Sequence, residues 1–303
     1  MIRRNGYGDV LTAWPLLVYL KNQNPNANIT LVIDERSKGL IPFLKGVDQT
    51  YVISKTKFKY WGIFKIIWKL RKIQFDLAFF VRGAPMKLGN IFLFFIRAKK
   101  KRAYTDSSWH SKLINDPLPY EKNQYSQAVK SIRLLDPDIT HIPKELYPTI
   151  EMKKTWTFDR KTLFISITNN RLGCRLDNDK YIRILNALNL EHPFHLIINA
   201  EPHDQKKAIE LEGKFQMSHQ VMITEKFEDL IKLIASIDYL FIGDGGIMHM
   251  AAAMQKKQLI LFGKTDICEW APLTDLALCI RDSKNVNGIC EDQILEALKK
   301  LVS

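Results

Sequence analysis

The sequence predicts an α/β protein of two consecutive domains, each with a doubly wound parallel sheet. Short apolar runs rich in β-branched and aromatic residues alternate with segments of helical periodicity, which is typical of parallel sheets. Both halves of the 303-residue chain show this alternation, and 46% hydrophobic residues suffice to fill two cores. The expected strands are Ile29–Ile33, Thr50–Ile53 and Asp76–Val81, then Leu163–Ile167, Phe194–Ile198, Tyr239–Ile242 and Gln258–Phe262.

The expected domain junction lies in the segment Asp136–Arg160. This segment is rich in proline and charge and has no clear periodicity, as is usual between domains. We therefore expect domains at residues 1–150 and 151–303. The segment Glu291–Leu301 has apolar residues at helical spacing and predicts an amphipathic helix, for which packing back on the first domain is one option.

The positive charge of the chain is concentrated in its first half. Residues 1–150 contain 25 Lys and Arg against 11 Asp and Glu, a net charge of +14, whereas residues 151–303 contain 20 against 21, a net charge of −1. This asymmetry indicates that the first half meets a polyanion, such as phospholipid headgroups, a phosphorylated glycolipid or nucleic acid. The alternative is a basic surface that serves only solubility.

Cysteine spacing and hydropathy indicate a cytoplasmic protein that does not cross a membrane. The four cysteines form no C-x-x-C pair, and the start of the chain has no secretory apolar region. The longest strongly apolar stretch, around Ile91–Ile96, is far shorter than the roughly 18 residues that span a bilayer.

A basic and aromatic segment, Lys55–Lys72, contains seven basic residues and no acidic ones, with Trp61 and Trp68 among them. In a helix that begins near Tyr60, three lysines share one face, and the apolar residues Ile63, Phe64, Ile66, Ile67 and Leu70 cover the rest. Such a helix suits docking on a membrane surface. It equally suits a crossover helix that buries its apolar face on the sheet, and both interpretations can hold together.

The first candidate site is the segment N-G-Y-G-D-V, which begins at Asn5 and follows a short apolar start. It precedes the helical pattern Leu11–Leu20, so it is expected to form a strand-to-helix turn where backbone amides approach a ligand. Leu11 occupies the third position of a G-x-G-x-x-G motif, which argues against dinucleotide binding. Asp9 would face the ligand crevice at the carboxyl edge of the sheet. Alternatively, Asp9 is only a helix N-cap.

The second candidate site is the segment that runs from Phe241 to Ala253, again a strand, a glycine turn and a helix of small residues. The backbone amides of Gly245 and Gly246 are placed to bind a diphosphate at the helix N-terminus, and His249 to donate a hydrogen bond to it. A packing role for His249 is the alternative. Another strand end, Phe262–Asp266, adds Lys264 and Thr265 to the same edge.

Taken together, these motifs resemble glycosyltransferase family 9, the ADP-heptose:lipopolysaccharide heptosyltransferases. The resemblance rests on G-x-G-D-V-L near the start and on D-G-G-x-x-H-x-A-A-A, L-F-G-x-T-D and W-x-P later, and it covers nearly the whole chain. It implies a GT-B fold, with two Rossmann-like domains that face a central cleft. The first domain would bind the acceptor and the second the nucleotide-sugar.

The same resemblance implies the reaction and its partners. The implied reaction is an inverting transfer of a heptosyl residue from ADP-heptose to the inner core of lipopolysaccharide. The acceptor would be a Kdo- or heptose-bearing lipid A, and the reaction would need neither metal nor cofactor. The enzyme would be peripheral, on the cytoplasmic face of the inner membrane. Signatures of nucleic-acid-binding folds are absent from the sequence, so no nucleic-acid partner is expected.

Site residues follow from the resemblance. Asp9 would be the general base, Glu201 would hold the ADP ribose, and the segment from Asp244 to His249 would surround the diphosphate. The family's phosphate-binding lysine falls near Cys174, so Arg171 or Arg175 is expected to supply the charge. Two further positions depart from the family pattern: Gly245 replaces a serine or threonine, and Lys264 a proline.

The acceptor side is expected to include Gly8, Lys55, Lys57 and Arg82. Arg82 would follow the strand Asp76–Val81, and its alternative is an ordinary exposed arginine. Two other functions stay open, namely a GT-B transferase with a different nucleotide-sugar donor and a non-catalytic paralogue that binds anionic glycolipid. An epimerase would need an additional acid/base set, which the sequence does not reveal.

Overall fold

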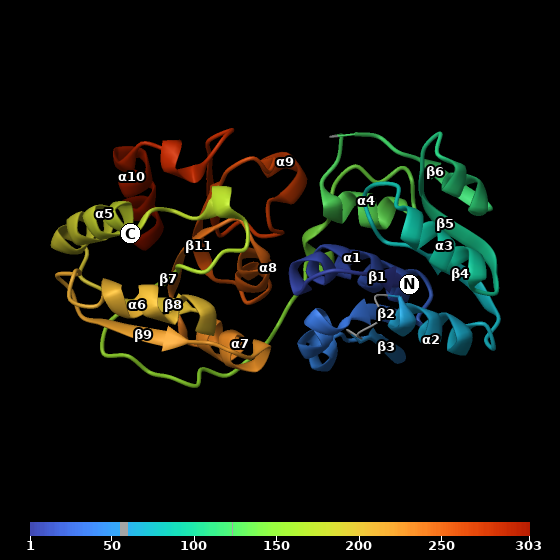
Figure 1. The fold of residues 1–303 in the computed structure, drawn as a ribbon, viewed down its shortest axis with the longest axis horizontal. Coiled ribbons are helices and arrows are strands. Elements are labelled where there is room, and N and C mark those ends of the chain that lie inside the picture. The colour runs from blue at the N-terminus through green and yellow to red at the C-terminus, as the bar shows by residue number, and fades with distance from the viewer. Residues whose placement is uncertain (55–59, 123) are drawn as a thin grey trace. The chain divides into compact units, whose positions relative to one another are not determined.

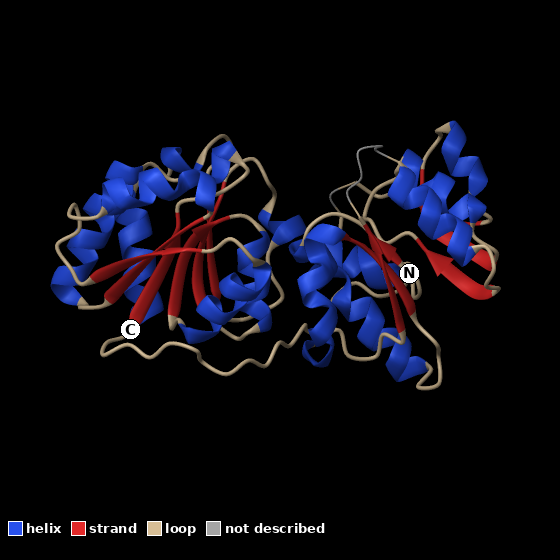
Figure 2. Cartoon of the chain, turned by 60° about the horizontal axis from the view of Figure 1, so that its bottom comes forward, coloured by secondary structure: helices blue, strands red, loops and turns tan. Residues whose placement is uncertain are grey.

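The computed structural model describes residues 1–54, 60–122 and 124–303 and divides into two compact units, Met1–Pro148 and Thr149–Ser303 (Figure 1). The sequence predicts this boundary two residues later, after residue 150. Each unit is an α/β structure in which the paired strands run parallel, and helices lie on both faces of the sheets (Figure 2).

Unit 1 contains six strands, which form two three-stranded sheets, β1-β2-β3 and β4-β5-β6. The strands are β1 (Ile2–Arg3), β2 (Thr30–Asp34), β3 (Gln49–Ile53), β4 (Phe75–Phe79), β5 (Ala98–Thr105) and β6 (Asp116–Pro119). The helices are α1 (Tyr7–Gln23), α2 (Trp61–Leu70), α3 (Lys87–Phe95) and α4 (Gln127–Arg133), with the 3-10 helices η1 (Glu35–Phe43), η2 (Trp109–Leu113) and η3 (Lys144–Leu146).

The two sheets of unit 1 are continuous. A parallel bridge joins Ile2 to Phe80, directly after β4, so the strands follow the order β3-β2-β1-β4-β5-β6. This is the Rossmann order, in which the chain reverses its direction of travel between β1 and β4. Ligands of such sheets bind at the carboxyl ends of the two strands that flank this switch point.

Unit 2 repeats the same arrangement. Its strands are β7 (Thr162–Ser166), β8 (His195–Ala200), β9 (His219–Ile223), β10 (Tyr239–Gly243), β11 (Lys257–Phe262) and β12 (Ala277–Arg281). Its helices are α5 (Asn178–Glu191), α6 (Gln205–Leu211), α7 (Phe227–Ser236), α8 (Gly246–Ala253), α9 (Ile267–Trp270) and α10 (Glu291–Val302), with η4 (Leu172–Cys174), η5 (Pro202–Asp204) and η6 (Val286–Gly288). The order β9-β8-β7-β10-β11-β12 places the switch point between β7 and β10.

All seven expected strands are present, and their ends differ from the predicted ones by at most two residues. For the last helix, α10, the sequence left packing on the first domain as one option. The apolar stripe of α10, including Ile294 and Leu298, is buried in the core of unit 2 with Leu185 and Leu188 of α5. The stripe is therefore fully used within its own unit.

Helix α2 forms where the sequence predicts it, but one of its residues faces the other way. Ile63, Ile66, Ile67 and Leu70 are buried, whereas Phe64 is exposed rather than part of the apolar face.

In the described part of the chain, no helix is both long enough and apolar enough to cross a membrane.

Candidate functional site

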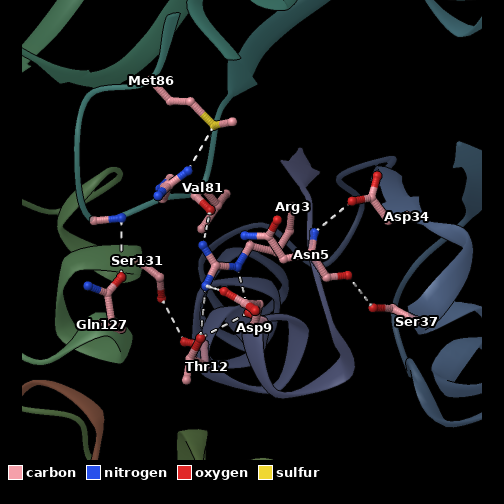
Figure 3. A network of polar contacts seen from close by, with 12 residues as sticks. Arg3, Asn5, Asp9, Thr12, Asp34, Ser37, Val81, Met86, Gln127 and Ser131 are labelled. Carbon is pink, nitrogen blue, oxygen red and sulfur yellow. Dashed lines mark hydrogen bonds and ion pairs between the residues drawn. The ribbon is translucent and has the colours of Figure 1, made fainter. Parts of the chain in front are cut away.

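The turn after β1 is held in an uncommon backbone conformation at the switch point of unit 1. Asn5 has a φ of 91°, in the left-handed region that asparagine tolerates better than most residues. Its N–H donates to Asp34 Oδ2 at 2.9 Å, and its carbonyl accepts from Ser37 Oγ at 3.0 Å (Figure 3). The end of β2 and the start of η1 thus fix the turn that leads into α1.

Asp9 lies in the first turn of α1, with its side chain 24% exposed. Gly6 is the N-cap residue, so the interpretation of Asp9 as an N-cap was wrong. Its Oδ1 atom accepts a hydrogen bond from Arg3 Nη2 at 2.8 Å. The partial positive charge at the helix N-terminus also favours a carboxylate here. The carboxylate is therefore fixed through one oxygen while the side chain remains accessible.

Arg3 is the main support of Asp9 and was not predicted from the sequence. The residue is buried, and in Figure 3 its guanidinium points to Asp9, Thr12 and Val81. Nε donates to the Asp9 carbonyl and Nη1 to the Val81 carbonyl, both at 2.6 Å. Burial lowers the pKa of Arg3, the Asp9 charge raises it and the nearby Arg82 lowers it further. The feature of the sequence that could have indicated this role is the position of Arg3, a charged residue at the end of a short apolar strand.

The expected acceptor residues occupy different environments. Arg82 follows β4 on the other side of the switch point, is half-buried, and donates to Met86 Sδ at 3.0 Å. It is not an ordinary exposed arginine. Gly8 is buried in the first turn of α1. Lys55 and Lys57 fall outside the described residues.

The corresponding turn in unit 2 follows β10 and leads into α8. Asp244 is buried with 1% exposure, and its backbone N–H donates to the Leu261 carbonyl at 2.9 Å. Gly245 is the N-cap of α8 and has no side chain to bond the free amides of the first turn, which begins at Gly246. This turn can receive an anion at the helix N-terminus.

Arg171 brings a positive charge to the same turn from the loop after β7. Its Nη1 atom forms an ion pair with Asp244 Oδ2 and lies 3.5 Å from Thr265 Oγ1. The guanidinium also lies 5.9 Å from the ring of Trp270. Among the described residues, the other carboxylate oxygen of Asp244 has no hydrogen-bond partner although it is buried. Arg171 thus spans the switch point between β7 and β10, with half of its side chain in solvent.

Asn169 organises this loop and is a second residue that was not predicted from the sequence. Its Oδ1 atom accepts from the Arg171 backbone N–H at 2.9 Å, and its Nδ2 donates to the Asp244 carbonyl at 3.0 Å. The side chain therefore ties the β7 loop to the β10 turn. The only feature of the sequence that could have indicated Asn169 is its position, because it follows a buried strand at the carboxyl edge of the sheet.

The loop then passes directly over the ends of β10 and β11. A Cβ atom at Gly243 would overlap the carbonyl oxygen of Cys174, and one at Gly263 would press on the carbonyl oxygen of Gly173. Both strand ends thus need glycine because another backbone crosses them. Cys174 itself is buried, and burial raises the pKa of its thiol. The resemblance to glycosyltransferase family 9 places a phosphate-binding lysine near this position, where a buried thiol offers a ligand no positive charge.

Arg175 points to a different place from Arg171. Its Nη2 atom pairs with the buried Asp204 at 3.1 Å, and Asp204 also pairs with Lys207 and accepts from Thr168 Oγ1. Burial alone would raise the pKa of Asp204, but these hydrogen bonds and the Arg175 charge together lower it. Arg175 lines a pocket of about 630 Å³ beside the N-terminus of α5. The structure thus separates the two arginines that the sequence offered as equivalents.

The remaining predicted donor residues lie near the carboxyl edge of the unit 2 sheet. Glu201 follows β8 with an exposed side chain, and His203 Nδ1 lies 3.7 Å from its Oε2 atom. His249 is buried one turn into α8. Lys264 is exposed and follows β11. Across residues 1–54, 60–122 and 124–303, no three His, Cys, Asp or Glu side chains are grouped to hold a metal.

Comparison with known proteins finds similarity across the chain. A family profile described as glycosyltransferase family 9 (heptosyltransferase) matches residues 63–298. Lipopolysaccharide heptosyltransferase 1 of Campylobacter coli is 21% identical, over 99% of this chain and 98% of that protein. Lipooligosaccharide heptosyltransferase 2 of Haemophilus ducreyi is 26% identical, over 90% and 85% respectively. The structure of E. coli ADP-heptose lipopolysaccharide heptosyltransferase II superposes with a TM-score of 0.80 at 17% identity, over 99% and 97%, and shows a shared fold.

Proposed function

The chain belongs to glycosyltransferase family 9, the heptosyltransferases of lipopolysaccharide biosynthesis, and on this premise we propose that it transfers a heptosyl residue from ADP-heptose to the lipopolysaccharide inner core. The acceptor is lipid A that carries Kdo or heptose. The donor is proposed from the E. coli structural neighbour, which is an ADP-heptose heptosyltransferase. Two parallel α/β units of Rossmann order, shared with that neighbour, give the chain the GT-B fold.

The reaction is a single inverting displacement. An acceptor hydroxyl oxygen forms a bond to the anomeric carbon, the bond from that carbon to the ADP oxygen breaks, and the hydroxyl proton passes to Asp9. Charge develops on the departing diphosphate, so the transition state gains from fixed positive groups around it. A base to accept the proton and a cationic diphosphate site are therefore the two requirements.

One observation carries the proposal: both switch points hold groups suited to these two requirements. In unit 1, Asp9 follows β1 and Arg82 follows β4. In unit 2, Arg171 follows β7, and the Asp244–Gly246 turn follows β10. Arg3 holds one oxygen of Asp9 and leaves the side chain accessible, as a base requires.

Arg171 and the N-terminus of α8 supply positive charge without a bound cation. We expect transfer to proceed with no metal and no cofactor, because a guanidinium binds two phosphate oxygens at once and the helix amides bind others. Full activity in excess EDTA is the expected result. Loss of activity in EDTA that Mg²⁺ restores would contradict this part of the proposal.

The lipid-linked acceptor places the enzyme at a membrane. We propose peripheral association with the cytoplasmic face of the inner membrane through the basic first unit, whose net charge of +14 favours anionic headgroups. No nucleic-acid partner is proposed.

The direct test is ADP release from ADP-heptose with heptose-deficient lipopolysaccharide as the acceptor. We expect release that depends on the acceptor, and omission of the acceptor is the control. If the enzyme consumed another nucleotide-sugar and not ADP-heptose, the proposed donor would be wrong and the chain would be a GT-B transferase with a different donor. Binding of the glycolipid without turnover of any donor would support a non-catalytic paralogue instead.

The two arginines should differ in their effect on the donor. We expect Arg171→Met to raise the KM for ADP-heptose about 10- to 100-fold, because it removes one charge-assisted contact to the diphosphate. The matched variant Arg175→Met should change the KM less than about threefold, because its guanidinium faces Asp204 and not the turn that leads into α8.

Thermal unfolding of both variants checks their folding, because each leaves a buried aspartate, Asp244 or Asp204, without its arginine. Arg171→Lys, which keeps the charge, should recover part of the donor affinity. If the two methionine variants raised the KM for ADP-heptose equally, the assignment of the diphosphate site to Arg171 would be wrong.

A further inference from the structure

The exposed large aromatic side chains of this protein are confined to one region of unit 1. In the described part of the chain, every aromatic residue among the exposed large apolar side chains lies between positions 60 and 109. Four lie at or in α2, two at the end of α3 and one in η2: Tyr60, Trp61, Phe64, Trp68, Phe94, Phe95 and Trp109. Isolated exposed apolar residues are normal, but a group of this size marks an interaction site.

The three segments adjoin one another. Helices α2 and α3 contact each other, and α3 contacts η2 (Figure 1). The buried faces of both helices share one core, where Ile63 and Ile67 of α2 meet Phe92 and Leu93 of α3. Since their apolar faces are already packed, the exposed aromatic rings are additional to what folding requires.

A lysine accompanies most of these rings. The Nζ atom of Lys72 lies 4.2 Å from the ring centre of Trp68, and Lys87 lies 5.3 Å from that of Trp109. The corresponding distances from Lys101 to Phe94 and from Lys65 to Trp61 are 5.6 and 5.8 Å. Residues 60–109 contain eleven Lys and Arg against two Asp, so the region is strongly cationic.

We propose that α2, the end of α3 and η2 form one aromatic–lysine surface that docks on an anionic lipid bilayer. Tryptophan and phenylalanine rings insert at the level of the headgroups, and the lysines beside them bind lipid phosphates. The excess of positive charge selects an anionic membrane over a neutral one. This inference rests on the proposed membrane association and extends it from α2, the segment evident in the sequence, to α3 and η2.

Vesicle co-sedimentation of the full chain tests the surface without any transferase assay. We expect binding to vesicles of phosphatidylcholine mixed with phosphatidylglycerol, a decrease with added salt, and little binding to pure phosphatidylcholine. Tryptophan fluorescence should shift to shorter wavelength on binding. Equal binding to both vesicle types, or to neither, would overturn the proposal.

Single substitutions then test whether the surface extends beyond α2. Trp68→Ser in α2 and Phe94→Ser in α3 should each weaken vesicle binding about tenfold or more, because each removes one inserted ring. Leu190→Ser is the matched control, since Leu190 is 82% exposed but lies in unit 2. An effect of Trp68→Ser without one of Phe94→Ser would restrict the surface to α2 and overturn the extension.

A lipid-free core oligosaccharide separates this inference from the proposed reaction. Turnover of that soluble acceptor should be the same in wild type, Trp68→Ser and Phe94→Ser, whereas turnover of vesicle-embedded acceptor should fall in the two variants. An inactive wild type that still binds anionic vesicles would contradict the reaction and leave the surface intact. Retained vesicle binding in a Trp68→Ser/Phe94→Ser double variant would show that these rings do not make the membrane contact and would overturn the proposal.

Discussion

Asp9→Asn is expected to lower kcat for heptosyl transfer by about two to four orders of magnitude. Asparagine has the same shape and can keep the hydrogen bond from Arg3 through its amide oxygen, but it cannot take a proton from the acceptor hydroxyl. The loss should therefore appear in kcat, with little change in the KM for ADP-heptose. Initial rates of ADP release at saturating acceptor give both quantities.

The matched control is Asp48→Asn, which removes another carboxylate of unit 1 that is paired with a cation, here Lys21 at 3.2 Å. This variant should keep the wild-type kcat, because Asp48 lies in the turn before β3 and not at the switch point. If Asp9→Asn retained more than half of the wild-type turnover, Asp9 would not be the base.

Gly243→Ala is expected to lower the free energy of unfolding by about 2–3 kcal/mol. The added methyl group overlaps the Cys174 carbonyl, which belongs to a backbone that cannot move as a side-chain end can. Relief of the overlap must displace the loop that carries Arg171, so the affinity for ADP-heptose should fall as well. Urea unfolding and calorimetric titration with the donor measure the two effects.

Gly245→Ala is the matched control, two residues further along the same turn. The nearest atom to its new Cβ lies at 3.8 Å, an ordinary contact, and its φ of 176° is open to any residue. We expect a change in unfolding free energy within about 0.5 kcal/mol. If the two glycine variants lost stability equally, the crossing loop would not be the reason for glycine at position 243.

The sequence predicts the strands that are mostly apolar or β-branched and misses strands in which charged and polar residues interrupt the pattern. Strands such as β7 and β11 are nearly continuous apolar runs because helices cover both of their faces. Strand β5 was not predicted, since Lys99, Lys100 and Lys101 stand together in it and interrupt any apolar pattern. The outer strands β9 and β12 mix exposed and half-buried residues, so their periodicity is weak.

The same division applies to the candidate site. The glycine turns around Asp9 and Asp244 were evident, because strand, turn and helix follow one another locally in the sequence. The bond from Arg3 to the Val81 carbonyl joins residues 78 positions apart, and no local pattern encodes it. For the same reason, the sequence could not tell which arginine meets Asp244. The outward orientation of Phe64 was equally hidden, since apolar residues occur all around α2.

The repeated strand order has an evolutionary consequence. Each sheet is complete within its own unit, and in the described chain no strand of one unit pairs with a strand of the other. A recombination event near codons 148 and 149 would therefore exchange a whole set of ligand-binding turns without opening either sheet. Under the proposed function, in which unit 1 binds the acceptor and unit 2 the donor, such an exchange would change one substrate in a single genetic step and keep the other.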